Sequence, residues 1–192
     1  MAEGRQTAVI LIGLGLLLSH TEAAEPGAFG LGRPVSAAEL SAWDSAIAPD
    51  GHNLPPGRGS VAQGRAVYAA RCAACHGSRG EGGLGDRLVG GQGSLATATP
   101  VRTVGSFWPY ATTLFDYVRR AMPFDAPRTL SDEDVYAVSA YVLFLNGLLE
   151  ENAELDADHL LAIRMPNRDG FVADPRPDVR ILDCMHDCSR QR

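Results

Sequence analysis

Two cysteines and a histidine lie within five consecutive residues of this chain. Cys72 and Cys75 are separated by two residues, and His76 follows the second cysteine directly. Thiols at this spacing stand about one helical turn apart, so both can add to the two vinyl groups of a single haem. The imidazole that follows then lies beneath the iron and can bind it as an axial ligand. The pattern therefore predicts one covalent haem c.

Other sites also use paired cysteines. A zinc ribbon needs a second close pair with matching spacing, whereas Cys184 and Cys188 lie far along the chain and are separated by three residues. A thioredoxin-like redox pair needs a strand-helix-strand context, which this sequence does not predict. A chance occurrence of the motif, with an ordinary disulfide, is the third alternative. For Cys184 and Cys188 we expect a local disulfide, with free thiols or bonding to another chain as alternatives.

A helix is predicted directly upstream of the cysteines. Ser60 and Gln63 form a capping box, from which the helix runs over about 61–72. One face of this helix carries Val61, Gly64, Tyr68 and Cys72. Because Gly64 has no side chain, another helix can cross closely at that point.

Two further helices are predicted downstream. The longer one begins after Ser131 and stops at Asn146-Gly147. Its apolar stripe comprises Val135, Val138, Tyr141, Val142, Leu145 and Leu148. A shorter helix over 114–121 follows Thr113, with Asp116 three residues later.

A long glycine-rich segment separates His76 from these downstream helices. Loops of this length are uncommon in compact domains, and wrapping a haem would account for it. The candidate haem contacts are Leu88, Val89, Leu95, Phe107, Trp108 and Tyr110, each with core packing as the alternative.

The order of these elements resembles a small class I cytochrome c, a mainly α fold with helices packed around one covalent haem. The resemblance implies that the first and last helices cross through Gly64 and Tyr68 against Tyr141. The family often carries a Gly-Pro-x-Leu segment whose proline carbonyl holds the proximal histidine. This chain has "GDRLVG" there, so Asp86 or Arg87 replaces the proline and the hydrogen-bond partner of the histidine stays open.

The second axial ligand is predicted from helix order. In class I cytochromes c a methionine sulfur comes from the loop before the last core helix, which here contains Met122. Pro123 follows it and keeps that loop from becoming helical. Met165 lies beyond the last core helix. The alternatives to Met122 as the second ligand are Met165, Met185, a histidine and an open axial position. Ligation by His76 and Met122 would suit outer-sphere electron transfer.

Longer stretches resemble a narrower group. "GSFWPYATTLFDYVRRAMPFDAP", "MPNRDGFVADPRPDV" and the lead-in over 31–68 are similar to the cytochrome c subunit of Sox sulfur dehydrogenase and to cytochromes of molybdenum sulfite dehydrogenases. This resemblance covers about 30–183. It implies a molybdopterin partner subunit that oxidises sulfite, thiosulfate or sulfane sulfur and passes single electrons to the haem, which then reduces a small soluble acceptor cytochrome.

One departure limits that resemblance, because the Sox subunit usually carries two haem domains and this chain has one CxxCH motif. The sulfur substrate therefore stays open. The alternatives are a stand-alone soluble electron carrier, a haem protein with an open axial site, and a module without haem held by disulfides.

The N-terminus predicts export. Ala8–Leu18 is an apolar run of 11 residues, shorter than the roughly 20 that a membrane span needs. We expect residues 1–23 to be a signal peptide, with retention as a crude anchor as the alternative. The mature protein would then be periplasmic and without a stable membrane span. The formal net charge of −6 and the lack of a basic run argue against nucleic-acid binding.

The remaining chain divides into three predicted parts. An N-terminal extension over 24–59 contains a short helix at about 37–46, capped by Ser36 and Glu39. The cytochrome c domain spans 60–149. A C-terminal extension covers 150–192 and opens with an acidic stretch, 150–160, which we expect to be a solvated turn or a contact for a basic partner.

Overall fold

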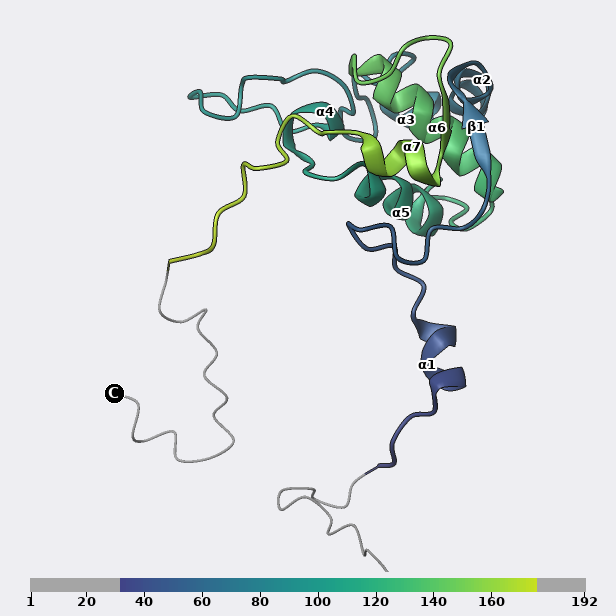
Figure 1. Ribbon diagram of the computed structural model, residues 1–192. Coiled ribbons are helices and arrows are strands. Elements are labelled where there is room, and N and C mark those ends of the chain that lie inside the picture. Colours follow the sequence, from purple (N-terminus) through teal and green to yellow (C-terminus); the bar gives the residue numbers. More distant parts are fainter. Residues whose placement is uncertain (1–31, 176–192) are drawn as a thin grey trace, which may run out of the picture. The chain divides into compact units, whose positions relative to one another are not determined.

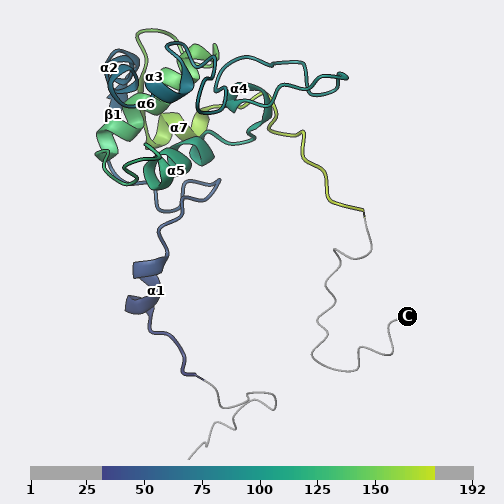
Figure 2. The same ribbon diagram turned by 180° about the vertical axis from the view of Figure 1, so that it is seen from behind.

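The computed structural model of the chain describes residues 32–175 and is mainly helical (Figures 1 and 2). The predicted signal peptide and Met185, Cys184 and Cys188 lie outside the described residues. The elements are α1 (Ala37–Trp43), β1 (Arg58–Ser60), α2 (Val61–Arg71), α3 (Ala73–His76), α4 (Val104–Phe107), α5 (Ala111–Ala121), α6 (Asp132–Leu145), β2 (Glu154–Asp156) and α7 (Ala157–Ala162). Within 32–175, no helix has the length and apolar character that crossing a bilayer requires.

Helices α2 and α6 cross in close contact at Gly64. A Cβ atom at this position would lie 1.8 Å from the carbonyl oxygen of Ala137, so only glycine allows the two backbones to come this close. One turn later, the ring of Tyr68 lies 5.3 Å from that of Tyr141, inclined at 60°. The predicted crossing through a glycine and aromatic rings is confirmed.

The predicted starts of the two long helices, α2 and α6, are also confirmed. The Ser60 side chain accepts the backbone N–H of Gln63, and the Gln63 side chain accepts that of Ser60 in return. At the start of α6, the Ser131 hydroxyl oxygen accepts the backbone N–H of Asp134 at 3.1 Å. These bonds satisfy N–H groups that have no partner within the helix, which explains why each helix begins where local sequence predicts.

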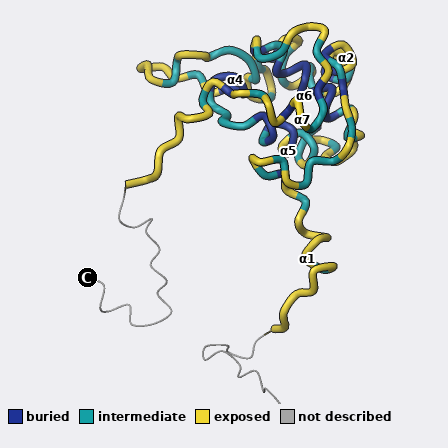
Figure 3. The backbone as a smooth tube through the Cα atoms, in the orientation of Figure 1, coloured by how far each residue is buried: buried dark blue, intermediate teal, exposed yellow. Residues whose placement is uncertain are grey.

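Helix α6 is buried more completely than its predicted apolar stripe indicates. All nine residues from Val135 to Leu143 are buried, including the small and polar residues between the stripe positions. Helix α2 packs on one side and α5 on another, and both strands also contact α6 (Figures 1 and 3). The central helix of the core therefore has no broad solvated face.

Helix α5 begins at Ala111, so the prediction that Thr113 caps a helix over 114–121 is wrong. Tyr110 stands at the N-cap position without a side-chain hydrogen bond. Buried Ala111 and Thr112 extend the helix at its start, which shows that packing rather than capping sets this boundary. Helix α1 has the predicted Ser36 and Glu39 cap but ends at Trp43.

Residues 150–160 do not form a solvated turn, so that prediction is wrong. Strand β2 pairs antiparallel with β1, placing Leu155 opposite Gly59. Helix α7 follows, with the Asp156 side chain accepting the backbone N–H of His159 at 2.9 Å. Leu155 and Leu160 are almost fully buried between acidic neighbours, so two apolar positions hold this stretch on the core.

The core also receives a residue from the segment before β1. Ile47 is buried, and its backbone N–H donates to Oδ1 of Asp116 at 2.9 Å. Nε of Arg120 donates to the same carboxylate oxygen at 2.8 Å.

Residues 42–175 form one compact unit, and residues 32–41 belong to another.

We expect Asp116→Asn to lower the free energy of unfolding at neutral pH by about 2 kcal/mol, because a charged hydrogen bond inside the protein is lost. Burial alone would raise the pKa of Asp116, but the hydrogen bonds from Arg120 and Ile47, with nearby arginine charge, hold this pKa below its ordinary value. Such a carboxyl contributes stability above its unfolded pKa, and this contribution is lost as pH falls through the folded pKa. The difference between the two proteins should therefore shrink below about pH 4.

Urea unfolding across a pH series measures this effect. The exposed Asp125 provides a control, and Asp125→Asn should stay within about 0.5 kcal/mol of the parent at every pH. A stability difference between Asp116→Asn and the parent that does not change with pH would contradict the assignment.

Candidate haem site

Three of the predicted site residues come together at the junction of α2 and α3. Cys72 ends α2 and precedes α3, which contains Cys75 and His76. The backbone N–H groups of Cys75 and His76 both donate to the carbonyl of Cys72, at 3.1 and 2.9 Å. This tight turn holds both thiols and the imidazole together. The two cysteines are unbridged, so the alternative of a disulfide between them is not what the structure shows.

The thiols lie in different surroundings. Cys75 is exposed, whereas Cys72 is half-buried and packs against the core. Burial raises the pKa of Cys72 to about 11, with the Arg71 charge opposing this shift and Cys75 adding to it. Among residues 32–175, no group of three or more histidine, cysteine or acidic side chains could hold a metal ion.

The orientation of His76 is set by the glycine-rich loop. Its Nδ1 lies 2.7 Å from the backbone carbonyl oxygen of Asp86 and donates to it. In that tautomer Nε2 carries the free lone pair, as an axial ligand of iron requires. Gly85 packs on the ring, since a Cβ there would lie 2.8 Å from Cε1 of His76. The open question of the partner is thus answered: the carbonyl of Asp86 replaces that of the family's proline.

Asn146 holds the next part of this loop, a role that its prediction as a helix stop did not reveal. Its Nδ2 donates to the carbonyl of Leu88 at 3.1 Å, and its Oδ1 accepts the N–H of Gly90 at 3.3 Å. Its own carbonyl accepts from Nε2 of Gln92 at 3.1 Å. Tyr68 fixes the start of the loop, because its hydroxyl donates to the carbonyl of Gly77 at 2.9 Å. The loop is therefore tied to both crossing helices.

Met122 comes from a separate element, the C-terminal end of α5. Its backbone is extended, with φ −120° and ψ 147°, and it is half-buried beside a buried Pro123. Within the described residues, no hydrogen bond or ion pair joins it to the cysteine-histidine turn. Met165, by contrast, is 1% exposed and belongs to the hydrophobic core. Of these two methionines, only Met122 has an accessible side chain.

Several exposed apolar side chains flank these positions. Leu84, next to Gly85, is 93% exposed, and Phe124, two residues after Met122, is 86% exposed. A haem bound beside these positions would cover apolar side chains of this kind. The six predicted haem contacts are all half-buried: Leu88, Val89, Leu95, Phe107, Trp108 and Tyr110. The thiol pair, the oriented imidazole and this apolar surface fit a haem, which Cys72, Cys75 and His76 would hold on one side.

The second Met-Pro pair lies beside the other end of the glycine-rich segment. After Met165 is buried in the core, Nδ2 of Asn167 donates to the carbonyl of Phe107 at 2.7 Å. The guanidinium of Arg168 lies 4.2 Å from the centre of the Tyr110 ring. The ring of Phe171 meets that of Phe107 edge-on at 5.3 Å. The pair thus anchors the C-terminal segment on the loop around α4.

Comparisons with known proteins place the chain in a family. The family model described as cytochrome c oxidase, cbb3-type, subunit III matches residues 59–142. A chain in the crystal structure of the sulfane dehydrogenase SoxCD from Paracoccus pantotrophus is 45% identical, with a TM-score of 0.71. That match covers 83% of this chain and 82% of the other. This chain belongs to the class I c-type cytochromes.

The cytochrome therefore has the predicted fold, and it takes haem as its cofactor in electron transfer. A further relative is the thiosulfate dehydrogenase of Stutzerimonas stutzeri (strain A1501), which is 31% identical over 117 residues. That match covers 53% of the cytochrome but 36% of the relative, so the cytochrome spans little more than a third of that protein. Both relatives bear names of sulfur-compound dehydrogenases.

Proposed function

We propose that this protein is a monohaem c-type cytochrome that transfers single electrons as the haem subunit of a molybdenum-dependent sulfur-compound dehydrogenase. One observation carries the proposal. The match to the SoxCD chain covers 83% of this chain, whereas the cytochrome family model covers only residues 59–142. Similarity therefore extends beyond the haem-binding core into segments that a general cytochrome does not need.

Four side chains would hold the cofactor. Cys72 and Cys75 would attach one haem by thioether bonds, and His76 and Met122 would ligate its iron. The haem supplies a centre that accepts and releases one electron. The hydrogen bond from His76 to Asp86 keeps the imidazole in one tautomer, which supports ligation and tunes the iron. A thioether ligand opposite the imidazole raises the reduction potential relative to a second histidine.

The partners and location follow from the same assignment. Electrons arrive from a molybdopterin subunit that oxidises sulfite, thiosulfate or sulfane sulfur, and leave to a small soluble cytochrome. Residues 1–23 direct export of the chain to the periplasm and are then removed. A cytochrome c domain at 60–149 then lies between extensions at 24–59 and 150–192. The core also takes up Ile47, Leu155, Leu160 and Met165 from those two extensions.

The test begins with haem attachment. Haem staining after denaturing electrophoresis should be positive for the parent and lost in the Cys72→Ser/Cys75→Ser variant. The Cys184→Ser/Cys188→Ser variant is the matched control and should keep the stain. Staining of the first variant would contradict covalent attachment through the motif.

The partner is tested with the native complex. A molybdenum protein should co-purify with the cytochrome, and sulfite or thiosulfate should reduce its haem only when that protein is present. A cytochrome that purifies alone and accepts electrons equally well from unrelated donors would instead be a stand-alone carrier.

A further inference from the structure

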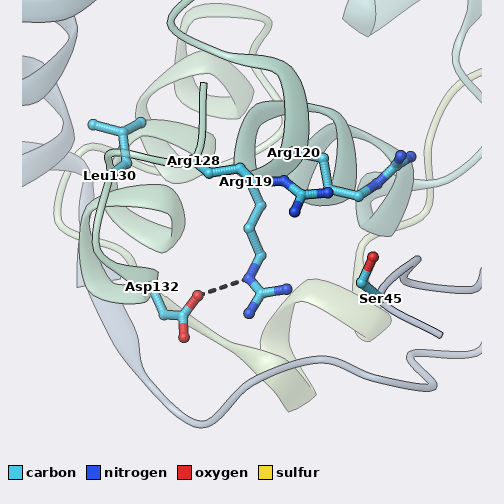
Figure 4. A pocket seen from close by; sticks show the side chains of 6 residues that line it. All are labelled: Ser45, Arg119, Arg120, Arg128, Leu130 and Asp132. Carbon is cyan, nitrogen blue, oxygen red and sulfur yellow. Dashed lines mark hydrogen bonds and ion pairs between the residues drawn. The ribbon is translucent and has the colours of Figure 1, made fainter. Parts of the chain in front are cut away.

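A recess lined by arginines lies beside the segment that contains Met122. Its volume is about 300 Å³. The last turn of α5, the segment before α6, the first residue of α6 and a residue that precedes β1 contribute to it (Figure 4). The lining side chains are Ser45, Arg119, Arg120, Arg128, Leu130 and Asp132.

Positive charge in this recess exceeds negative charge. Nε of Arg119 donates to Oδ1 of Asp132 at 2.8 Å, and Arg120 is paired with Asp116, which does not line the recess. No hydrogen bond or ion pair joins the guanidinium of Arg128 to any other residue within 32–175. Three arginines and two carboxylates leave a surplus of one positive charge, 3 − 2 = +1. A guanidinium without a carboxylate partner is well suited to bind an oxoanion.

The backbone supports the same interpretation. Arg128 has φ 63°, a left-handed conformation that non-glycine residues rarely adopt. The next residue is held in place, because Thr129 accepts a hydrogen bond from Nη2 of Arg71 at 3.0 Å and donates to the carbonyl of Ala126 at 2.7 Å. The backbone that carries the unpaired arginine is thus held beside the recess.

The lining groups surround one space. Figure 4 shows the Arg119 side chain reaching between Asp132 on one side and Ser45 on the other, with Arg120 and Arg128 near its base. Guanidinium and hydroxyl donors from three segments therefore line the same recess. This arrangement suits a compact ion better than the flat surface of an acidic protein.

We propose that this recess binds a small divalent oxoanion of the sulfate type, held by Arg119 and Arg128 with the Ser45 hydroxyl as a further donor. This inference goes beyond the proposed electron-transfer function and does not depend on it. The bound anion links the segment before β1 to the loop that contains Met122.

Isothermal titration calorimetry on the full haem-loaded chain tests the proposal. Sodium sulfate, thiosulfate and phosphate are titrated separately at constant ionic strength, with chloride as the reference salt. One-to-one saturable binding of at least one oxoanion is expected. The relative affinities then show whether the site prefers sulfur oxoanions or phosphate.

Variants connect that binding to the recess. Arg128→Gln should weaken affinity about tenfold, because a charged donor is lost. Asp132→Asn should strengthen it, because the carboxylate that competes for Arg119 is removed. Arg58→Gln is the matched control: Arg58 is an exposed arginine on β1 that pairs with Glu154, and its loss should leave affinity unchanged.

Two results would overturn the proposal. One is the absence of saturable binding of any of the three oxoanions to the parent protein. The other is equal affinity in the parent and Arg128→Gln, provided that both unfold at the same temperature in chloride.

Discussion

Replacing Met122 with alanine is expected to abolish the sulfur-to-iron charge-transfer band of the ferric cytochrome. The reduction potential should fall as well, because a thioether ligand favours the ferrous state more than water or a second imidazole does. The position of Met122 supports this expectation: it is half-buried, in extended backbone at the end of α5, beside an exposed Phe124. Absorption spectroscopy and a redox titration of the purified variant measure both effects.

Met165 provides the matched control for this experiment. It also precedes a proline, but its side chain is 1% exposed and packs in the hydrophobic core. Met165→Leu should keep the band and the potential, and lower the free energy of unfolding by less than about 1.5 kcal/mol. A band that survives in Met122→Ala would contradict the ligand assignment. Loss of the band in Met165→Leu would transfer the role to the second methionine.

Adding one methyl group to α2 is expected to have the largest effect on stability. In Gly64→Ala the new Cβ would lie 1.8 Å from the oxygen and 2.5 Å from the carbon of the Ala137 carbonyl. Both are backbone atoms of α6 and cannot rotate away, so the two helices must separate. We expect the free energy of unfolding to fall by about 3 kcal/mol, as overpacking of a rigid contact does. Urea unfolding of the haem-loaded protein measures it.

A control on the same helix separates this steric effect from helix propensity. Ala66 lies on the exposed face of α2, and Ala66→Val should cost less than about 1 kcal/mol. Helix α2 leads into Cys72, so Gly64→Ala should also reduce the yield of haem-loaded protein. Equal stability of the two variants would mean that the crossing at Gly64 is looser than the structure indicates.

Local sequence predicted the parts of the fold that depend on neighbouring residues. The capping bonds of Ser60 with Gln63 and of Ser131 with Asp134 join residues three apart, so their pattern is sufficient to place two helix starts. The start of α5 and the structure of residues 150–160 were predicted wrongly. Burial, rather than capping or charge, determines the conformation of both segments. Leu155 forms part of a strand only because Gly59, far away in the sequence, supplies the partner.

Part of the candidate site was likewise readable from the sequence alone. The spacing of Cys72, Cys75 and His76 predicted that the thiols and the imidazole lie close together, because residues three and four apart meet within about one helical turn. The assignment of Met122 as the opposite ligand stays a prediction from helix order. The segment that orients His76 was identified, but the choice of Asp86 required the loop to fold back on the imidazole.

By itself, then, the sequence determined the haem attachment motif, the helices that flank it and the glycine at which they cross. Only the tertiary structure decided which carbonyl holds His76, that Asn146 ties the loop to α6, and that Met165 is a core residue. It also brought Ser45, Arg119 and Arg128 around one recess. The physical reason is the range of the interactions. Caps and the CxxCH turn act within five residues, whereas burial and loop contacts join residues tens of positions apart, and no local pattern records those pairs.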